Sequence, residues 1–318
     1  MRKKLFLSFV ILSCALACAL TLSGCSDGNI SVDAFGVYRY DDSGSYLKAD
    51  TLANETSVYG ATISETVTEI DVGWVRGKVV LSSSEEADSI VFSETPDFEG
   101  EVPDEFVMRY RLDGTVLKIR FAQNGVDLSS AAYAEKKKTL IITVPASGSF
   151  AEIDIDTVSA AVEVSDIRAS ELSCGTVSGN ATATRCSAAE IDFESVSGEL
   201  LLSACSASNE LKTCTISGNI VVEDCPVSII DAESVSGKIR LQTTAASGNI
   251  EVKTVSGDVA VVLPSDVTGF GITFDSTSGE FSSASSVTVS GKTYTYGTPS
   301  FVIDCKTVSG DASVDLKE

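Results

Sequence analysis

The sequence predicts an all-β protein, a single-chain β-solenoid (β-helix) with rungs of 19–20 residues and less regular β caps at both ends. From residue 157 onward, a motif of Thr or Ser, Val or Ile, Ser and usually Gly recurs at an almost constant spacing. Around each motif, apolar and polar residues alternate, which is the pattern of strands. A fixed repeat of this length is typical of a solenoid, in which each unit buries its apolar face against its neighbours.

The motif serines define the period of the repeat. The central Ser advances by 19, 19, 20, 19 and 20 residues, and looser copies follow after 22 and 31 residues. We expect a hydrogen-bonded Ser ladder at one corner of the solenoid, a structural role rather than a catalytic one. The Gly after each Ser is expected to relieve a turn with positive φ. The repeat-corner serines are Ser159, Ser178, Ser197, Ser217, Ser236, Ser256 and Ser309.

Short strands account for each rung. After the Ser-Gly pair, apolar residues alternate with polar ones, as at Ile220 and Val222 and again at Ile239 and Leu241. Residues 150–260 show no apolar residues at helical spacing. We therefore expect two or three strands per rung, rich in the Thr, Val and Ile that suit a pleated surface.

Three cysteines share one position of the repeat. Cys186, Cys205 and Cys225 each follow the Ser of their rung by eight residues, the position that Thr244 and Pro264 take in later rungs. Stacked rungs bring equivalent residues about 4.8 Å apart, so we expect an inward-facing structural column of thiols. Buried thiols pack as small hydrophobic groups, and a disulfide between adjacent rungs is an open alternative because the Cα spacing allows it. Zinc is less favoured, because it prefers four ligands around a point.

The N-terminus has the features of a bacterial lipoprotein signal. Basic residues at positions 2–4 precede an uncharged apolar run, residues 5–22, and the small residues Ser23 and Gly24 lead to Cys25. The end of this segment resembles the lipobox of bacterial lipoproteins, in which the signal is cut before the Cys and the Cys carries the lipid. An ordinary signal peptide or an uncleaved membrane helix is the alternative. We expect lipidation of Cys25 and a membrane-anchored, extracytoplasmic location in the bacterial cell envelope.

The remaining chain divides by its regularity. A degenerate rung lies at residues 68–81, a hairpin with an Asp113-Gly114 turn at 106–121 and a strand at 139–145, and Lys136 to Lys138 are interpreted as a solvated loop. The predicted domains are a signal peptide at 1–24, a lipid-anchored tether and lead-in segment at 25–60, and a solenoid at 61–318 with an N-terminal cap at 61–150, regular repeats at 151–262 and a C-terminal cap at 263–318 that ends in a final rung at 301–316.

The composition excludes several function classes. The chain has 45 acidic residues, 23 basic residues and no His among its 318 residues, with a net charge of −22. Without His, a His general base and a His-ligated zinc site are excluded, and the acidic excess argues against nucleic acid. Asp154 and Asp156 are paired carboxylates, but glycosidase chemistry needs two carboxyls across a cleft. We expect no catalytic residue, no cofactor and no metal, and therefore no enzyme.

The serial Thr-Val-Ser-Gly-Asp/Asn units resemble the bacterial "putative adhesin" domain family, often labelled as a domain of unknown function. The resemblance covers residues 65–318, from the unit around Trp74 through the hairpin to the ending at Asp311. It implies a β-solenoid at the bacterial cell envelope, and some relatives are tied to envelope stress and antimicrobial-peptide responses. Several rungs depart from the family pattern by carrying Cys, which leaves the redox state of the core open.

Three hypotheses for function follow. The first is a surface-anchored, non-catalytic lipoprotein whose solenoid face is an adhesin-like binding or structural module for an unknown envelope polymer or protein. The second is an envelope-stress sensor or decoy that binds cationic antimicrobial peptides; removal of residues 1–24 takes away three basic residues and leaves a charge of −25, and such binding would be salt-sensitive. The third, a polysaccharide-active enzyme, needs a concave row of paired carboxylates.

Overall fold

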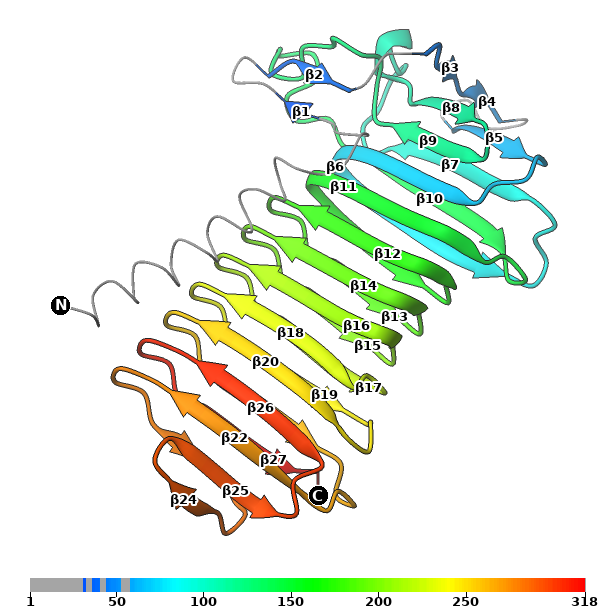
Figure 1. Cartoon of the computed structure of the whole chain (residues 1–318). Helices are drawn as coiled ribbons and strands as arrows, with labels where there is room; N and C mark the ends of the chain where they lie inside the picture. Colours follow the sequence, from blue (N-terminus) through cyan, green and yellow to red (C-terminus); the bar gives the residue numbers. More distant parts are fainter. Residues whose placement is uncertain (1–30, 33–35, 41–43, 53–57, 318) are drawn as a thin grey trace. The chain divides into compact units, whose positions relative to one another are not determined.

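The computed structural model describes residues 31–32, 36–40, 44–52 and 58–317. They form two compact units, an N-terminal unit that ends at Gly179 and a C-terminal unit that begins at Asn180 (Figure 1). Both units are β-solenoid, as predicted. The predicted signal peptide and Cys25 lie outside the described residues. No helix among the described residues is long and apolar enough to cross a membrane.

The N-terminal unit is built around one long strand, β6, which forms a complete rung. The first half of β6 pairs in parallel with β9 and β11, and its second half pairs in parallel with β10 and β11. The elements are β1 (Ser31–Val32), β2 (Tyr38–Arg39), β3 (Leu47–Lys48), β4 (Asp50–Thr51), β5 (Tyr59–Ile63), β6 (Glu69–Ser84), β7 (Ile90–Pro96), η1 (Asp104–Phe106), β8 (Arg109–Asp113), β9 (Val116–Arg120), β10 (Lys138–Pro145), β11 (Phe150–Ser165) and β12 (Ala169–Thr176).

The irregular strands of the N-terminal unit cap this rung. The β8–β9 hairpin is antiparallel with Asp113 opposite Val116, which confirms the predicted turn at Asp113-Gly114. On the other side, β7 pairs antiparallel with β10 and β5 pairs antiparallel with β7. The outermost strands are short, and short strands limit edge-to-edge pairing with other chains.

Parts of the predicted tether pack against this cap. Tyr38 and Ala49 are fully buried, and the Tyr38 hydroxyl donates to the Gly73 carbonyl at 3.1 Å. A tether was expected here because Ser, Asp, Gly and Tyr are frequent and no long periodic run is present. Isolated aromatic residues were enough to anchor the segment, since each buries a large apolar surface.

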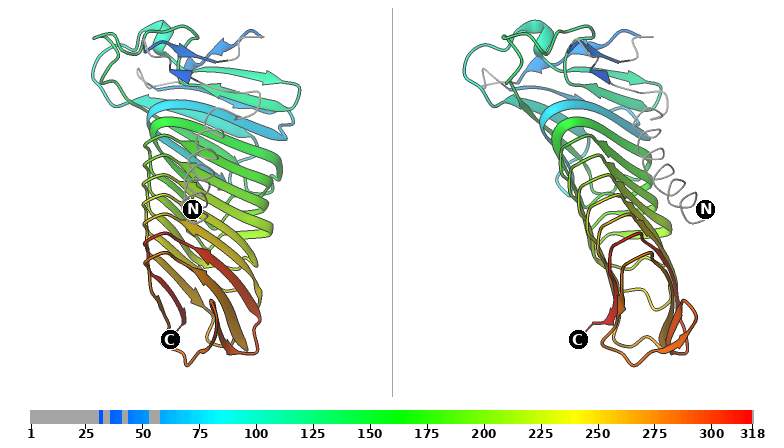
Figure 2. Two further views of the ribbon diagram at one scale, coloured as in Figure 1. Left: turned by 60° about the vertical axis from the view of Figure 1, so that its left-hand side comes forward. Right: turned by 90° about the vertical axis from the view of Figure 1, so that its left-hand side faces the viewer.

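The C-terminal unit stacks parallel strands in two series (Figure 2). The first series is β14, β16, β18, β20, β26 and β22, and the second is β13, β15, β17, β19, β21, β27 and β23. The strands are β13 (Ala181–Thr184), β14 (Ser187–Ser195), β15 (Leu200–Ser203), β16 (Ser206–Thr215), β17 (Ile220–Cys225), β18 (Ile229–Ser234), β19 (Ile239–Thr243), β20 (Gly248–Thr254), β21 (Val259–Leu263), β22 (Gly269–Asp275), β23 (Phe281–Ser282), β24 (Thr288–Ser290), β25 (Thr293–Gly297), β26 (Phe301–Lys306) and β27 (Ala312–Leu316).

The last rung in the sequence is not the last rung in space. Ile303 of β26 pairs with Ile250 of β20 on one side and with Ile272 of β22 on the other. Residues 301–316 are therefore inserted between two earlier rungs, which corrects the expected terminal position. The outer edge of β22 is instead covered by β25, which forms a hairpin with β24. Such a hairpin protects the end of a parallel stack from pairing with other chains.

Candidate functional site

The motif serines link successive rungs at one corner. In the C-terminal unit, Ser217 donates to the Val196 carbonyl and Ser236 to the Ile216 carbonyl, both at 3.3 Å. The same geometry places the Ser159, Ser178, Ser256 and Ser309 hydroxyls on carbonyls of neighbouring rungs at 3.2–3.5 Å. Ser197 begins the same corner of its rung. The other six hydroxyls each donate to a backbone carbonyl, which is a structural arrangement.

The first residue of each motif has a role that sequence reasoning missed. The Thr215 hydroxyl is fully buried and accepts the Gly218 N–H at 3.0 Å. Ser234 accepts the Gly237 N–H in the same way at 2.8 Å. The signal was present in the sequence, because a hydroxyl residue stands three positions before nearly every motif Gly. This bond satisfies an amide inside the turn that would otherwise be buried without a partner.

The motif glycines are required for a different reason from the expected one. The motif positions are absent from the glycines with positive φ. A Cβ at Gly237 would instead lie 1.7 Å from the Gly218 carbonyl oxygen, and a Cβ at Gly218 would lie 1.9 Å from that of Gly198. Only Gly allows successive backbones to approach this closely, so the positive-φ interpretation is wrong.

The three column cysteines lie inside the C-terminal unit. Cys186, Cys205 and Cys225 are at most 1% exposed. Ser187 and Ser206, which follow two of them, pair in register. The residue before each Cys has left-handed φ, which turns the following side chain inward; these residues are Arg185, Ala204 and Asp224.

The column does not continue through the positions expected from residue spacing. Cys225 pairs with Thr243 rather than Thr244, and the buried residue in the next rung is Leu263 rather than Pro264. In the described rungs beyond Cys225, the residues equivalent to Arg185, Ala204 and Asp224 do not have a left-handed φ. The inward position therefore comes one residue earlier there.

Lys138 is buried, and the interpretation of Lys136 to Lys138 as a solvated loop is wrong for this residue. Its Nζ lies 2.5 Å from Oε2 of Glu94, and both side chains are fully buried. The Nζ also donates to the Phe106 carbonyl at 2.6 Å and to the Phe121 carbonyl. The Trp74 ring centre lies 5.0 Å from the ammonium. Burial lowers the pKa of Lys138 to about 8 and raises the pKa of Glu94 above its usual value.

The paired carboxylates on β11 do not face each other across a cleft. Asp154 and Asp156 are two residues apart on one strand, and Asp154 pairs with Asp71 on β6. Asp71 receives two hydrogen bonds of 2.6 Å from Arg120. Burial and the nearby Asp156 raise the pKa of Asp154 to about 8. This row therefore holds a proton near neutral pH, but it lacks the opposed geometry of a glycosidase.

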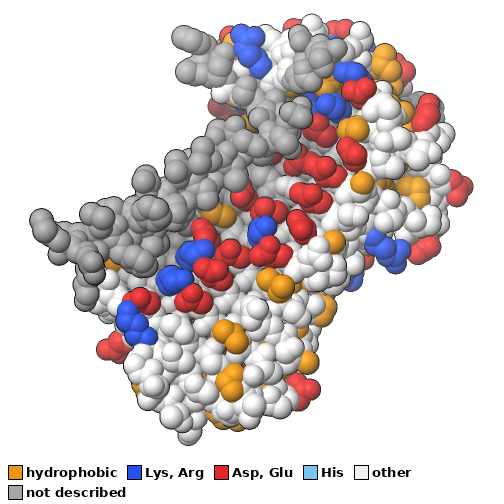
Figure 3. Space-filling view, viewed as in Figure 1, with side chains coloured by type: hydrophobic (Ala, Val, Ile, Leu, Met, Phe, Trp, Pro, Cys, Tyr) orange, Lys and Arg blue, Asp and Glu red, His pale blue; other side chains and the backbone are white. Residues whose placement is uncertain are grey.

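The outward face of the first strand series in the C-terminal unit is acidic (Figure 3); we call it the acidic face. Its charged residues follow the strand register and form mixed rows across the strands, in which Lys212 lies between Asp192 and Asp231. Nine carboxyl groups outnumber three lysines. They are Glu190, Asp192, Glu194, Glu210, Asp231, Glu233, Glu251, Asp304 and Asp275, with Lys212, Lys253 and Lys306.

Several of these charges interact within the acidic face. Lys253 Nζ lies 2.7 Å from Glu233 and 3.0 Å from Glu251. Burial raises the pKa of Asp231 to about 6. The outward residues of the second strand series are mostly uncharged, as at Thr182, Leu201 and Val221. The two outer faces of this unit therefore differ in charge.

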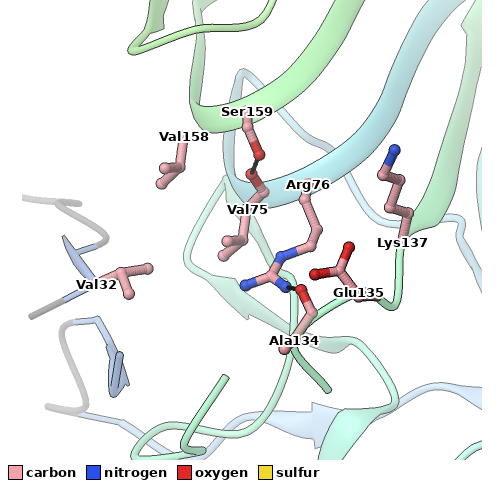
Figure 4. Close-up of a pocket in the computed structure, with 8 residues that line it drawn as sticks. All are labelled: Val32, Val75, Arg76, Ala134, Glu135, Lys137, Val158 and Ser159. Carbon is pink, nitrogen blue, oxygen red and sulfur yellow. Dashed lines mark hydrogen bonds between the residues drawn. The ribbon is translucent and has the colours of Figure 1, made fainter. Parts of the chain in front are cut away.

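The described residues offer open depressions. A cavity of about 320 Å³ in the N-terminal unit is lined by Arg76 and Ser159 among others (Figure 4). The Arg76 guanidinium donates to the carbonyls of Tyr133 and Ala134, so it holds the loop that contains these two residues. A second depression, of about 400 Å³, lies in the C-terminal unit beside Arg240 and Ser313. Within the described ranges, no group of three or more Cys, Asp or Glu side chains is arranged to hold a metal ion.

Comparison with known proteins places the chain in a family. No curated protein shows significant similarity to it. It is similar to the crystal structures of a putative adhesin from Parabacteroides distasonis (14% identity, 83% of this chain and 98% of that chain, TM-score 0.42) and a putative adhesin from Bacteroides fragilis (11%, 83% and 98%, 0.40). It is also similar to a putative cell adhesion protein from Clostridium sporogenes (13%, 83% and 100%, 0.26). The family described as Toastrack DUF4097 matches residues 107–315, well over half of the sequence, and the chain therefore belongs to the Toastrack DUF4097 family.

Proposed function

We propose that this protein is a non-catalytic lipoprotein of the bacterial cell envelope, anchored through a lipid on Cys25, whose acidic face binds an extended envelope polymer or protein. The observation that carries the proposal is the acidic face itself. In-register strands repeat outward carboxyl and lysine side chains at about 4.8 Å, which suits a ligand with a repeating structure. An open sheet surface contacts such a ligand through many shallow interactions rather than through one deep pocket.

The lipid anchor supports this arrangement. The lipobox-like segment would fix the chain to a membrane, and the acidic surface would keep the solenoid solvated and away from anionic lipid headgroups. Radiolabelled palmitate incorporation into the full chain, with Cys25→Ala as the control, tests the anchor. Loss of label in the variant is expected, and equal labelling of both chains would contradict lipidation at Cys25.

A pull-down tests the binding surface. The body, residues 26–318, is incubated with the envelope fraction of the producing cells at low and high salt. Specific capture that survives high salt is expected, and a triple variant of the acidic face, Glu210→Gln, Glu233→Gln and Glu251→Gln, should reduce it about tenfold. A matched variant on other surfaces of the same unit should retain wild-type capture; it carries Glu199→Gln, Glu223→Gln and Asp315→Asn. Equal loss in both variants would argue against the acidic face as the site.

The excess of carboxyl groups on the acidic face favours one second candidate, a sensor or decoy for cationic peptides. Such binding is mainly electrostatic and weakens as salt screens the charges. The same pull-down with a panel of lysine-rich peptides separates the two functions. Capture of many unrelated peptides that disappears at high salt would favour the decoy over the specific binding module.

A further inference from the structure

We propose that Cys186, Cys205 and Cys225 form a redox site in which one disulfide is shared, linking Cys205 to either of its two neighbours. Formation of this disulfide in the cell rests on the proposed extracytoplasmic location, because disulfides persist in oxidising compartments. The ability of the three thiols to form it rests on the geometry of the column alone.

The column places the three sulfur atoms in sequence. The backbone N–H of Cys205 donates to Sγ of Cys225 at 3.3 Å, and the Cys186 carbonyl accepts the N–H of Ser206, the residue after Cys205, at 2.9 Å. The residues before them share nearly the same left-handed φ, 53°, 52° and 51°, so each Cys leaves the backbone in the same direction. Cys205 is therefore the middle member, with one column cysteine on each side.

The spacing decides which pairs can form. In-register neighbours on adjacent strands have Cα atoms about 4.8 Å apart, within the range of about 4.4–6.8 Å found for disulfides. Cys186 and Cys225 are two rungs apart, roughly twice the distance of neighbours, which is too far for a bond. Two links are possible, Cys186–Cys205 and Cys205–Cys225, and both use Cys205.

The chemistry balances with a disulfide as oxidant. Two thiols lose two protons and two electrons to form the S–S bond, and an external disulfide such as oxidised glutathione accepts them and becomes two thiols. The third column thiol, as its thiolate, then attacks the Cys205 sulfur, and the neighbour that leaves takes up the proton. The bond thereby moves along the column without net oxidation. Because the folded column is buried, the first oxidation takes place while the rungs are still open.

Cys305 provides an internal control. It is as fully buried as the column cysteines, but its in-register neighbours are Val252 on β20 and Phe274 on β22. If burial alone led to disulfide formation, Cys305 would behave like the column cysteines. The proposal instead requires a stacked thiol, which Cys305 lacks, so Cys305 should remain reduced.

Disulfide mapping tests the proposal in two arms. In the first arm, the full chain is extracted from the producing cells in acid, alkylated in denaturant and digested with trypsin and a Glu-specific protease, which separates the column cysteines. In the second arm, the purified full chain is unfolded and refolded in a buffer of oxidised and reduced glutathione, then treated identically. Both expected links should together account for more than half of Cys205, with no Cys186–Cys225 link and with Cys305 alkylated.

Variants make the outcome decisive. Cys205→Ala should abolish both links, and Cys186→Ala should leave only the Cys205–Cys225 link. Complete alkylation of Cys205 in protein that has refolded to a protease-resistant state in the oxidised buffer would overturn the proposal, as would a Cys186–Cys225 link in Cys205→Ala. Links in the refolded protein but not in the cell extract would uphold the site and count against the extracytoplasmic location.

Discussion

The two units satisfy their buried polar groups in different ways. In the N-terminal unit, the described buried side chains include four ionisable groups, Glu94, Arg109, Arg120 and Lys138. In the described part of the C-terminal unit, the buried polar side chains are all Thr or Ser. A regular rung can be satisfied by short hydroxyls at repeated corners, because each rung presents the same backbone groups to the next. An irregular cap has unique backbone carbonyls in its core, and long cationic side chains reach them.

This difference determines where the stability of each unit is concentrated. A buried ion pair is costly to form, and it becomes strongly destabilising when one partner is removed. A repeated hydroxyl contributes little alone, since a typical hydrogen bond adds about 1 kcal/mol. The N-terminal unit should therefore be sensitive to loss of a single buried charge, and loss of one motif hydroxyl in the C-terminal unit should have a small effect.

The largest expected effect is at the buried pair of the N-terminal unit. Lys138→Met leaves Glu94 buried without its cation, so the unit should lose about 3–5 kcal/mol of unfolding free energy. Urea unfolding followed by fluorescence of Trp74, the one Trp of the chain, measures it. The double variant Lys138→Met with Glu94→Gln removes both charges and should recover much of the loss. Equal stability of the single variant and the wild type would show that the pair does not stabilise this core.

A close backbone approach in the C-terminal unit gives the next effect. Gly237→Ala puts a methyl group against the Gly218 carbonyl, and the overpacking should cost about 3 kcal/mol. Urea-dependent labelling of the buried Cys305 thiol reports the opening of this unit. Gly271→Ala is the matched control, because its Cβ would lie 3.7 Å from Pro299, an ordinary contact. Similar labelling midpoints for the two variants would contradict the stacked corner.

The carboxyl row of the N-terminal unit predicts a pH-dependent effect. The folded-state pKa of Asp154, about 8, lies above its unfolded value, so the folded state holds a proton that the unfolded state releases. The contribution of protonated Asp154 to stability is therefore full below about pH 4 and is lost as the pH rises to about 8. Asp154→Asn should gain about 2 kcal/mol over the wild type at pH 9 and little at pH 4. Trp74 fluorescence in urea measures both, with the exposed Glu99→Gln as control; a gain independent of pH would refute the assignment.

The smallest effects are expected at the motif hydroxyls. Thr215→Val keeps the shape but leaves the Gly218 N–H without its acceptor, which should cost about 1–2 kcal/mol. Ser217→Ala removes an exposed hydroxyl whose bond to the preceding rung, to the Val196 carbonyl, is long at 3.3 Å, and should cost less than about 0.5 kcal/mol. Cys305 labelling in urea compares the two. A larger loss for Ser217→Ala would reverse the roles assigned to the two motif positions.

Local patterns predicted the features that repeat. The Ser spacing located the corner, alternation located strands such as Ile220–Cys225, and the Asp113-Gly114 pair located the hairpin. These succeed because the repeat imposes the same environment on residues at the same position. The inward placement of Cys205 could be anticipated for that reason.

Features that depend on distant residues could not be predicted. Lys138 looks like a loop residue until the fold places Glu94 beside it. The order of rungs also differs from the order of the sequence, because Ile303 fits between Ile250 and Ile272 as well as it would at the end. The role of Gly237 needed the distance to the neighbouring rung, and a repeat pattern contains no such distance.

Recognition through the acidic face is best tested by a footprint of its carboxyl groups. The purified body, residues 26–318, is labelled at its carboxyl groups with a carbodiimide. The labelling is done with and without the part of the envelope extract that the body captures in the pull-down. Protection of Glu210, Glu233 and Glu251 together, with unchanged labelling of Glu199 and Glu223, is the predicted result. Protection confined to Glu199 and Glu223, or no protection at saturating extract, would contradict recognition through the acidic face.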